Sequence, residues 1–298
     1  MGERKRRTDL ERVPISFPEH MIGEEIIPVI GVENRDQHIY YKLIETGGTA
    51  TVDRGNSTAM SSRAVVDDEK DITLVMKEDR AHIPMKYVNE HGVKFADIAG
   101  ATSVKTTLAE KREIDVATLV LGGTGHISAA AGVIDAYNAN EESVDRVAGL
   151  KVFVTNKKTY NIIMGKAEIT DRMKYTGVIG ADQKMVRGLA PSVLAAILGC
   201  DLVLVGKNEF WNVGDAHTGK AAIVKIAPKN ISKADLLIKP YGMVEFMLKT
   251  AANQTPYEIY KDWDKDLKAP IYDAEGYSVT DTLNAECIVK FNNIAADA

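Results

Sequence analysis

The sequence predicts an α+β fold, in which separate groups of strands accompany one long helix and a mixed α/β block. Apolar residues recur at spacings of three and four from residue 93 to about residue 122, as Ile98, Ala101, Val104 and Leu108 show, which is typical of an amphipathic helix. From about residue 126 onward, helix-like and strand-like segments alternate. Further strand-like segments precede the helix and return near the C-terminus.

The composition is that of an ordinary globular protein: 298 residues, of which 45% are hydrophobic and 27% charged. The sequence contains no run of about 18 apolar residues, which a membrane-spanning helix would need. Its N-terminal region also contains no apolar stretch of signal-peptide length. The two cysteines, Cys200 and Cys287, are too few for a disulfide framework and fit a reducing compartment. These features predict no membrane association and argue against secretion.

The net charge of −5 argues against a protein that binds nucleic acid over its whole surface, although it leaves contact through one face open. The concentrated basic run Arg4-Lys5-Arg6-Arg7 stands at the N-terminus, diluted by nearby acidic residues. This run is either a solvated, flexible terminus or an arm that touches nucleic acid or a partner.

Residues 1–37 have the character of an arm. Prolines interrupt its short apolar pieces, and proline removes the backbone donors on which long regular elements depend. The stretch from residue 26 to 32 is nevertheless too apolar for a free tail, so either the rest of this chain or a neighbouring chain must cover it. We therefore take Ile26, Ile27 and Ile30 as candidate contact residues of the arm.

Two strand-like segments follow at residues 38–45 and 72–76, and about 25 polar residues from 47 to 71 lie between them. A structureless loop of this length is uncommon inside a compact domain and is usually functional. A two-stranded ribbon with no core of its own is marginally stable in water, so this feature makes physical sense if it lies on another subunit. Within it, Asp67, Asp68 and Glu69 are expected to form a solvated loop rather than a metal site.

The long helix has Lys105, Glu110 and Arg112 on its polar side and ends at Gly122-Gly123. At 1.5 Å per residue it would span about 40 Å, which suits a structural strut. After it we expect helices at 128–148 and 190–198, strands at 150–155, 201–205, 221–226, 244–248, 271–272 and 287–291, and either state at 160–164.

Two glycine-rich motifs resemble nucleotide-binding loops but lack essential parts. Residues 214–221 nearly form a P-loop, yet Ala221 stands where a hydroxyl residue would hold magnesium, and a strand-like run follows where a helix is needed. Residues 120–125 resemble a dinucleotide-binding turn, and Tyr257 with Lys261 supplies the Tyr-x-x-x-Lys pair of short-chain reductases. Against this, Ser128 replaces the third glycine, and no acidic residue ends the next strand.

No motif predicts catalysis or a bound cofactor. The six histidines are scattered, and no pair at i, i+4 and no His–Cys neighbour supports a zinc site. No Gly-x-Ser-x-Gly motif marks a nucleophile. We therefore assign no catalytic, cofactor-binding or metal-binding residue and predict that the chain is not an enzyme.

The order of the segments resembles the major capsid protein of tailed bacteriophages, the Hong Kong 97-type fold. Residues 22–32 are similar to the family's arm, Tyr40-Tyr41-Lys42 to the opening of its E-loop, residues 189–206 to a helix–strand unit of its A-domain, and residues 285–293 to its last P-domain strand. The resemblance implies an N-arm at 1–37, an E-loop at 38–83, a first P-domain part with the spine helix at 84–127, an A-domain at 128–243 and returning P-domain strands at 244–298.

This resemblance implies a subunit that self-assembles, as hexamers and pentamers, into an icosahedral shell around double-stranded DNA. Arg54, Gly55, Asn56 and Arg63 would lie at the tip of the E-loop and contact a neighbouring subunit. The implied partners are further copies of the chain, a portal, a separate scaffolding protein and the packaged DNA on the inner face. The implied location is the virion capsid, assembled in the host cytoplasm.

Two other functions stay open. An encapsulin-like compartment shell would share the fold and would hold a protein cargo in place of a genome. An NAD(P)-dependent short-chain reductase would use the motifs at residues 120–125 and 257–261.

Overall fold

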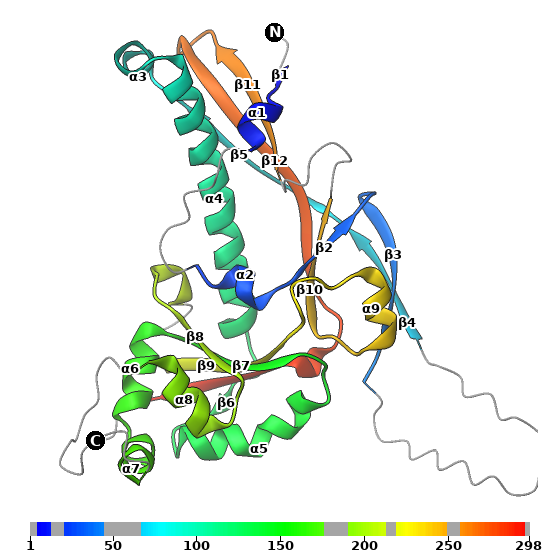
Figure 1. Cartoon of the computed structure of the whole chain (residues 1–298), viewed down its shortest axis with the longest axis vertical. Helices are drawn as coiled ribbons and strands as arrows, with labels where there is room; N and C mark the ends of the chain where they lie inside the picture. Colours follow the sequence, from blue (N-terminus) through cyan, green and yellow to red (C-terminus); the bar gives the residue numbers. More distant parts are fainter. Residues whose placement is uncertain are drawn as a thin grey trace, which may run out of the picture.

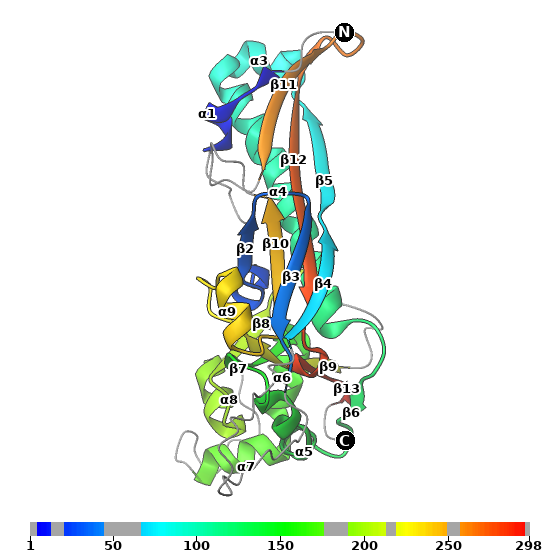
Figure 2. The same cartoon turned by 90° about the vertical axis from the view of Figure 1, so that its right-hand side faces the viewer.

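The computed structural model describes residues 5–12, 21–44, 67–175, 190–212, 219–248 and 257–295. Helix α4 (Val93–Leu121) runs along an elongated molecule. An α/β block lies at one end, and the hairpin of β11 (Glu258–Asp264) and β12 (Ala269–Thr282) reaches the other end (Figure 1, Figure 2). The predicted α+β class is confirmed, and so is the long helix, which ends one residue before Gly122.

The other elements are short. The further helices are α1 (Thr8–Glu11), α2 (Gly23–Ile26), α3 (Met85–His91), α5 (Val133–Asp145), α6 (Lys157–Gly165), α7 (Ala167–Tyr175), α8 (Pro191–Leu198) and α9 (Lys233–Ile238), with single 3-10 turns η1 (Glu209–Trp211) and η2 (Ala285–Cys287). The further strands are β1 (Lys5–Arg6), β2 (Val29–Val32), β3 (Asp36–Lys42), β4 (Asp67–Thr73), β5 (Val75–His82), β6 (Ile127–Ser128), β7 (Leu150–Asn156), β8 (Leu202–Gly206), β9 (Gly219–Ile226), β10 (Met243–Leu248) and β13 (Ile288–Ile294).

Strand β12 is the centre of a six-stranded sheet. β11 and β10 pair with successive parts of one side of β12, and β5 pairs with its other side, all antiparallel. β1 extends the sheet beyond β11, and β2 runs parallel to β10. Helix α4 packs closely on this sheet, because a Cβ on Gly100 would lie 2.1 Å from the Tyr272 ring.

The α/β block is built on a five-stranded sheet in the order β6-β13-β9-β7-β8. Successive residues of β7 serve two cores: Phe153 packs in the cluster of α5, α6 and α8, whereas Val152 and Val154 pack with Trp211 and the end of α4. Both faces of the sheet are therefore covered, which explains why its strands are continuous apolar runs.

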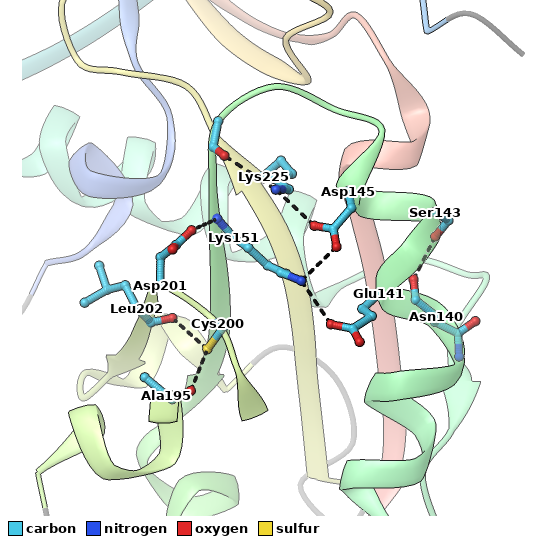
Figure 3. A network of polar contacts seen from close by, with 11 residues as sticks. Asn140, Glu141, Ser143, Asp145, Lys151, Ala195, Cys200, Asp201, Leu202 and Lys225 are labelled. Carbon is cyan, nitrogen blue, oxygen red and sulfur yellow. Dashed lines mark hydrogen bonds and ion pairs between the residues drawn. The ribbon is translucent and has the colours of Figure 1, made fainter. Parts of the chain in front are cut away.

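Charged groups join α5 to this sheet, as Figure 3 shows. Lys151 on β7 contacts both Glu141 and Asp145 of α5 at 2.9 Å, and Lys225 on β9 contacts Asp145 at 3.1 Å. Burial opposes ionisation of Asp145, but the hydrogen bonds from the two lysines hold its pKa below the usual value. The carboxylate therefore stays charged near neutral pH and keeps α5 fixed over β7 and β9.

The last strand lies in the α/β block. The resemblance implies a P-domain strand at 285–293, and in the structure β13 pairs with β9 and β6 in the five-stranded sheet. Phe291 and Ile294 are fully buried in the core beside α5, and Lys290 donates to the carbonyl oxygen of Gly122 at 2.5 Å. Burial of these two side chains explains why the strand lies in the block.

Candidate subunit-contact surfaces

Strands β3 and β4 form a separate two-stranded ribbon that leaves the body beside α9 (Figure 2). One face of the ribbon is buried: Ile39 and Ile72 are 2% and 4% exposed and pack in one cluster with Leu236 of α9 and Phe246 of β10. The base of the ribbon thus rests on its own chain. The expectation of a loop at 67–69 is corrected, because these residues pair with β3 in β4.

The other face of the ribbon is polar and exposed. His38 bonds Asp71 at 2.7 Å and Glu69 at 3.2 Å, and its ring stands edge-on to that of Tyr40, with centroids 4.7 Å apart. The hydrogen bonds to Asp71 and Glu69 raise the pKa of His38. The candidate residues Arg54, Gly55, Asn56 and Arg63 lie outside the described residues, so their contact with a neighbour stays a prediction.

The arm residues Ile26, Ile27 and Ile30 are 0%, 0% and 2% exposed. Ile26 and Ile27 pack with the end of α4, and Ile30 packs with β10 and the ribbon. The sequence allowed either the rest of this chain or a neighbouring chain to cover these residues, and in the structure the rest of this chain covers them. A contact of these three side chains with a neighbouring copy stays a prediction.

A buried carboxylate holds this part of the arm in place. Glu113 of α4 accepts the backbone N–H groups of Ile22 and Gly23, at 2.8 and 2.7 Å, and the indole N–H of Trp211 at 2.6 Å. A Cβ on Gly23 would stand 2.5 Å from the Glu113 carboxylate, which explains the glycine. Glu113 therefore joins the arm, the long helix and the α/β block.

Large apolar side chains are exposed at the end of the molecule far from the α/β block. At the corner between α3 and α4, the ring of His91 lies 5.0 Å from those of Tyr87 and Phe95, and these two aromatic residues are 50% and 47% exposed. Three further side chains are about half exposed at the corner and hairpin tip: Val93, Trp263 and Leu267. Grouped apolar exposure of this kind is typical of an interaction surface.

The sequence did not reveal this surface. Ile98 was counted on the buried side of the long helix but is 51% exposed, whereas Asp97 and Gly100 are buried. The sheet covers the side of the helix that bears Asp97, Gly100 and Ala101, so its placement decides which residues are buried. One feature of the sequence could have indicated this surface. Val93, Phe95 and Ile98 stand close together in the first turns of the helix, and one helix face cannot bury all three apolar side chains.

An acidic hollow of about 450 Å³ lies over β5 and β12, lined by Glu78, Asp79, Arg80, Asp273 and Glu275. Arg80 bonds Asp273 at 2.6 Å. Glu78, Glu275 and Glu258 are direct partners across three neighbouring strands, and like charges at such positions repel. The hollow is therefore an acidic part of the surface of the elongated half.

The structure contradicts the reductase interpretation. Val120 and Leu121 are the last residues of helix α4, so the glycines at 122–125 follow a helix rather than a strand. Tyr257 and Lys261 lie along an extended segment, where four residues span about 13 Å, so the phenol and the ammonium are not brought together as they would be on a helix. Burial raises the pKa of Tyr257 to about 12, and Lys261 bonds Asp97. A strand, β9, begins at Gly219 where a P-loop would need a helix.

The described residues contain no group of three or more His, Cys, Asp or Glu side chains placed to hold a metal ion. No helix among them is long and apolar enough to cross a membrane.

No family model and no curated protein sequence matches the chain. Solved structures do match it. A phage-related protein from Bordetella bronchiseptica RB50 is 13% identical, with 99% of each chain covered and a TM-score of 0.68. The capsid of the cyanophage P-SCSP1u is 11% identical over 96% of this chain and 91% of that chain, with a TM-score of 0.54. The SrpI encapsulin of Synechococcus elongatus PCC 7942 is 9% identical over 95% and 91%, with a TM-score of 0.55. The chain therefore has the fold of these three structures, as the order of its segments predicts.

Proposed function

We propose that the chain is a major capsid protein of a tailed bacteriophage, whose copies assemble into an icosahedral shell around double-stranded DNA. The observation that carries the proposal is similarity of fold along nearly the whole chain. The match to the phage-related protein covers 99% of both chains, and the match to the cyanophage capsid covers 96% of this chain and 91% of that chain. A shell protein acts through its surfaces, so the chain is treated as structural and no residue is assigned a catalytic role.

Two features of the described residues support contacts between copies. The ribbon of β3 and β4 is a sheet of only two strands, separate from both larger sheets. The far end exposes Tyr87, Phe95 and Trp263 to about half of their surface. A closed symmetric shell repeats each contact many times, so a single contact needs to contribute little.

Within this proposal the parts keep the predicted division into N-arm (1–37), E-loop (38–83), P-domain (84–127 and 244–298) and A-domain (128–243), except that β13 joins the A-domain sheet. Arg54, Gly55, Asn56 and Arg63 contact a neighbouring copy and set its register. The copies form hexamers and pentamers, with a portal and a separate scaffolding protein as partners, and the DNA touches the inner wall. Assembly takes place in the host cytoplasm.

An encapsulin-like compartment is the second candidate, because the SrpI encapsulin has the same fold. The two functions differ in what the shell contains. Shells isolated from the native host should protect double-stranded DNA from nuclease if the chain is a capsid protein. A protein cargo without genome would favour the compartment.

The test of the shell itself is expression of the full chain, size-exclusion chromatography and negative-stain electron microscopy. Uniform closed particles are the expected result. Discrete dimers or tetramers that bind NADPH would overturn the proposal.

A further inference from the structure

We propose that Lys220, Lys290 and the turn at residues 122–125 together bind a phosphate group of nucleic acid. We call these residues the phosphate site. The inference rests on the proposed function and deepens it, because it names residues through which the shell wall contacts double-stranded DNA. Since the whole chain has a net charge of −5, nucleic acid needs a local group of cationic and hydrogen-bond donors of this kind.

The five-stranded sheet brings the two lysines together where β9 and β13 pair at the edge of the α/β block (Figure 2). Lys290 on β13 is the direct partner of Ala222 on β9. Side chains alternate along a strand, so Lys220, two residues before Ala222, projects from the same face as Lys290. Residues in this diagonal relation are about 7–8 Å apart, and the two ammonium groups therefore repel each other.

The charges of these two lysines are not balanced within the described residues. Lys290 donates one hydrogen bond to the carbonyl oxygen of Gly122 at 2.5 Å, which leaves two of its three ammonium protons available. The side chain of Lys220 has no hydrogen bond or ion pair with another described residue. Burial and the charge of Lys220 lower the pKa of Lys290. An anion bound between the two lysines would relieve this repulsion.

A second pair of lysines on the same sheet shows how such repulsion is relieved within the chain. Lys151 on β7 and Lys225 on β9 are direct partners. Both contact the carboxylate of Asp145, at 2.9 and 3.1 Å (Figure 3). No carboxylate of the described residues forms such a contact with the lysines of the phosphate site. The corresponding anion must therefore come from another molecule.

The turn after α4 adds backbone donors to the site. Gly123 and Gly125 have φ angles of 78° and 81°, in the left-handed region that favours glycine, and turns of this kind form concavities that bind anions. The backbone N–H groups of Gly123, Thr124 and Gly125 donate to no other described residue. A Cβ on Gly123 would stand 3.6 Å from the Lys290 ammonium, so the turn and the lysine are adjacent.

The phosphate site unites parts of the two glycine-rich motifs that lack a complete nucleotide-binding loop. Lys220 is the lysine of the P-loop-like segment, and residues 122–125 are the glycine-rich part of the dinucleotide-like turn. Residues 123–125 are exposed, and a Cβ on Gly125 would have no heavy atom within 4 Å. An open site suits the backbone of a long polymer, whereas a nucleotide cofactor is bound in an enclosed cleft. The ligand class is therefore the phosphodiester backbone of nucleic acid.

The first test maps the contact by chemical labelling of lysines. The full-length chain is acetylated with and without a short DNA duplex, and labelled peptides are identified by mass spectrometry. We expect the duplex to reduce labelling of Lys220 and Lys290. Labelling of Lys229, an exposed residue beyond the other end of β9, should not change. Two further arms use inorganic phosphate in place of the duplex and shells that contain no DNA.

The second test measures affinity for the duplex by fluorescence anisotropy at several salt concentrations. Lys220→Glu should raise the dissociation constant about tenfold and lower the slope of log affinity against log salt by about 1. Lys229→Glu makes the same change of charge and is the matched control. Thermal unfolding should show Lys220→Glu to be as stable as the wild type, because the new carboxylate would stand beside Lys290.

Two further variants keep the affinity test independent of that substitution. Lys220→Gln removes one charge without reversing it and should weaken binding less than Lys220→Glu does. Thr124→Asp places a carboxylate in the exposed turn without changing either lysine, and it should also weaken binding. Equal dissociation constants for Thr124→Asp and the wild type would remove the turn from the site and overturn the inference.

Three other results also overturn it. The first is an equal effect of Lys220→Glu and Lys229→Glu on affinity, which would show only a general effect of charge. The second is protection of Lys220 in DNA-free shells, which would assign the site to a carboxylate of a neighbouring copy. The third is protection by inorganic phosphate but not by the duplex. Electron microscopy scores shell formation separately, so shells with any of these results contradict this inference alone, whereas a chain that forms no shells contradicts the proposed function.

Discussion

Trp211 donates its indole N–H to the carboxylate of Glu113 at 2.6 Å, and both side chains are almost fully buried. The hydrogen bond connects the turn after β8 to the long helix, and the same carboxylate accepts two backbone N–H groups of the arm. One side chain therefore holds together three segments that are far apart in the sequence.

Replacing Glu113 by alanine should destabilise the protein by about 2–4 kcal/mol, because three buried donors lose their acceptor. Urea denaturation of the wild type and of Glu113→Ala measures the difference. Glu110→Ala, a substitution one turn away on the same helix at a partly exposed position, should change the free energy of unfolding by less than about 0.5 kcal/mol. Equal effects of the two substitutions would contradict this role of Glu113.

The buried carboxylate of Asp97 should make stability depend on acid pH. Burial opposes its ionisation, but hydrogen bonds from Lys261 and Tyr272 and the charge of Arg7 lower its pKa in the folded state. Its contribution is therefore complete above the unfolded pKa of about 3.9 and is lost as the pH falls below that value toward the folded pKa.

Asp97→Asn should accordingly flatten the fall in unfolding free energy below about pH 4. Denaturation midpoints measured between neutral and acidic pH test this. Asp171→Asn, which removes an exposed carboxylate paired within α7, should leave the profile nearly as in the wild type. A profile of Asp97→Asn that overlays the wild type would refute the assignment.

Gly100→Ala should destabilise the protein by disturbing the close packing of the long helix on β12. The new Cβ would meet the Tyr272 ring at 2.1 Å, and overpacking of this kind costs about 1–3 kcal/mol. Thermal unfolding measures the loss, with Thr102→Ala on the partly exposed side of the same turn as the control, which should be close to neutral. A Gly100→Ala protein as stable as the control would show that the ring can move away at no cost.

His38 should titrate above the usual histidine pKa, because Asp71 and Glu69 both hydrogen-bond its ring. The hydrogen bonds of the His38 ring to β4 are therefore strongest below about pH 6.5, where the ring is protonated, and weaken as the pH rises through the pKa of the folded state. Following the His38 ring signals by NMR gives the value directly. Asp71→Asn should lower this pKa more than Glu69→Gln, since the contact with Asp71 is shorter, and Asp36→Asn should not change it.

Phe95→Ser should weaken assembly while leaving the fold stable. The ring is 47% exposed, so we expect the unfolding free energy to change by less than about 0.5 kcal/mol. If the far end contacts a second copy, loss of an aromatic anchor should raise the concentration needed for assembly by about tenfold. Light scattering against protein concentration measures this, with exposed Asn89→Ser on α3 as the control. Coinciding curves for the Phe95→Ser and wild-type proteins would remove this end from the contact surface.

Local patterns in the sequence were sufficient for the elements whose stability is local. The long helix begins and ends where the apolar spacing and Gly122-Gly123 place it, and β7, β8 and β9 coincide with short apolar runs closed by glycine, proline or polar residues. Strand β11 was missed, because its sequence is mostly charged and aromatic and becomes a strand only through pairing with β12.

Contacts between distant segments were beyond the sequence pattern. The apolar character of Ile26, Ile27 and Ile30 predicted that something covers them, but which surface does so depends on α4 and β10. The sheet that β13 joins and the reversal of Asp97 and Ile98 on the long helix depend in the same way on tertiary packing. The docking of Arg6 and Arg7 was hidden because their partners, Glu258 and Asp97, lie far along the chain.

The length of β12 has a mechanical consequence. Its 14 residues run from the hairpin tip toward the α/β block and are hydrogen-bonded to neighbours on both sides. Antiparallel hydrogen bonds stand perpendicular to the strands, so tension applied along the molecule loads them in shear and they resist collectively rather than one after another. Strand β12 therefore resists extension of the molecule along its long direction, and helix α4 beside it resists compression.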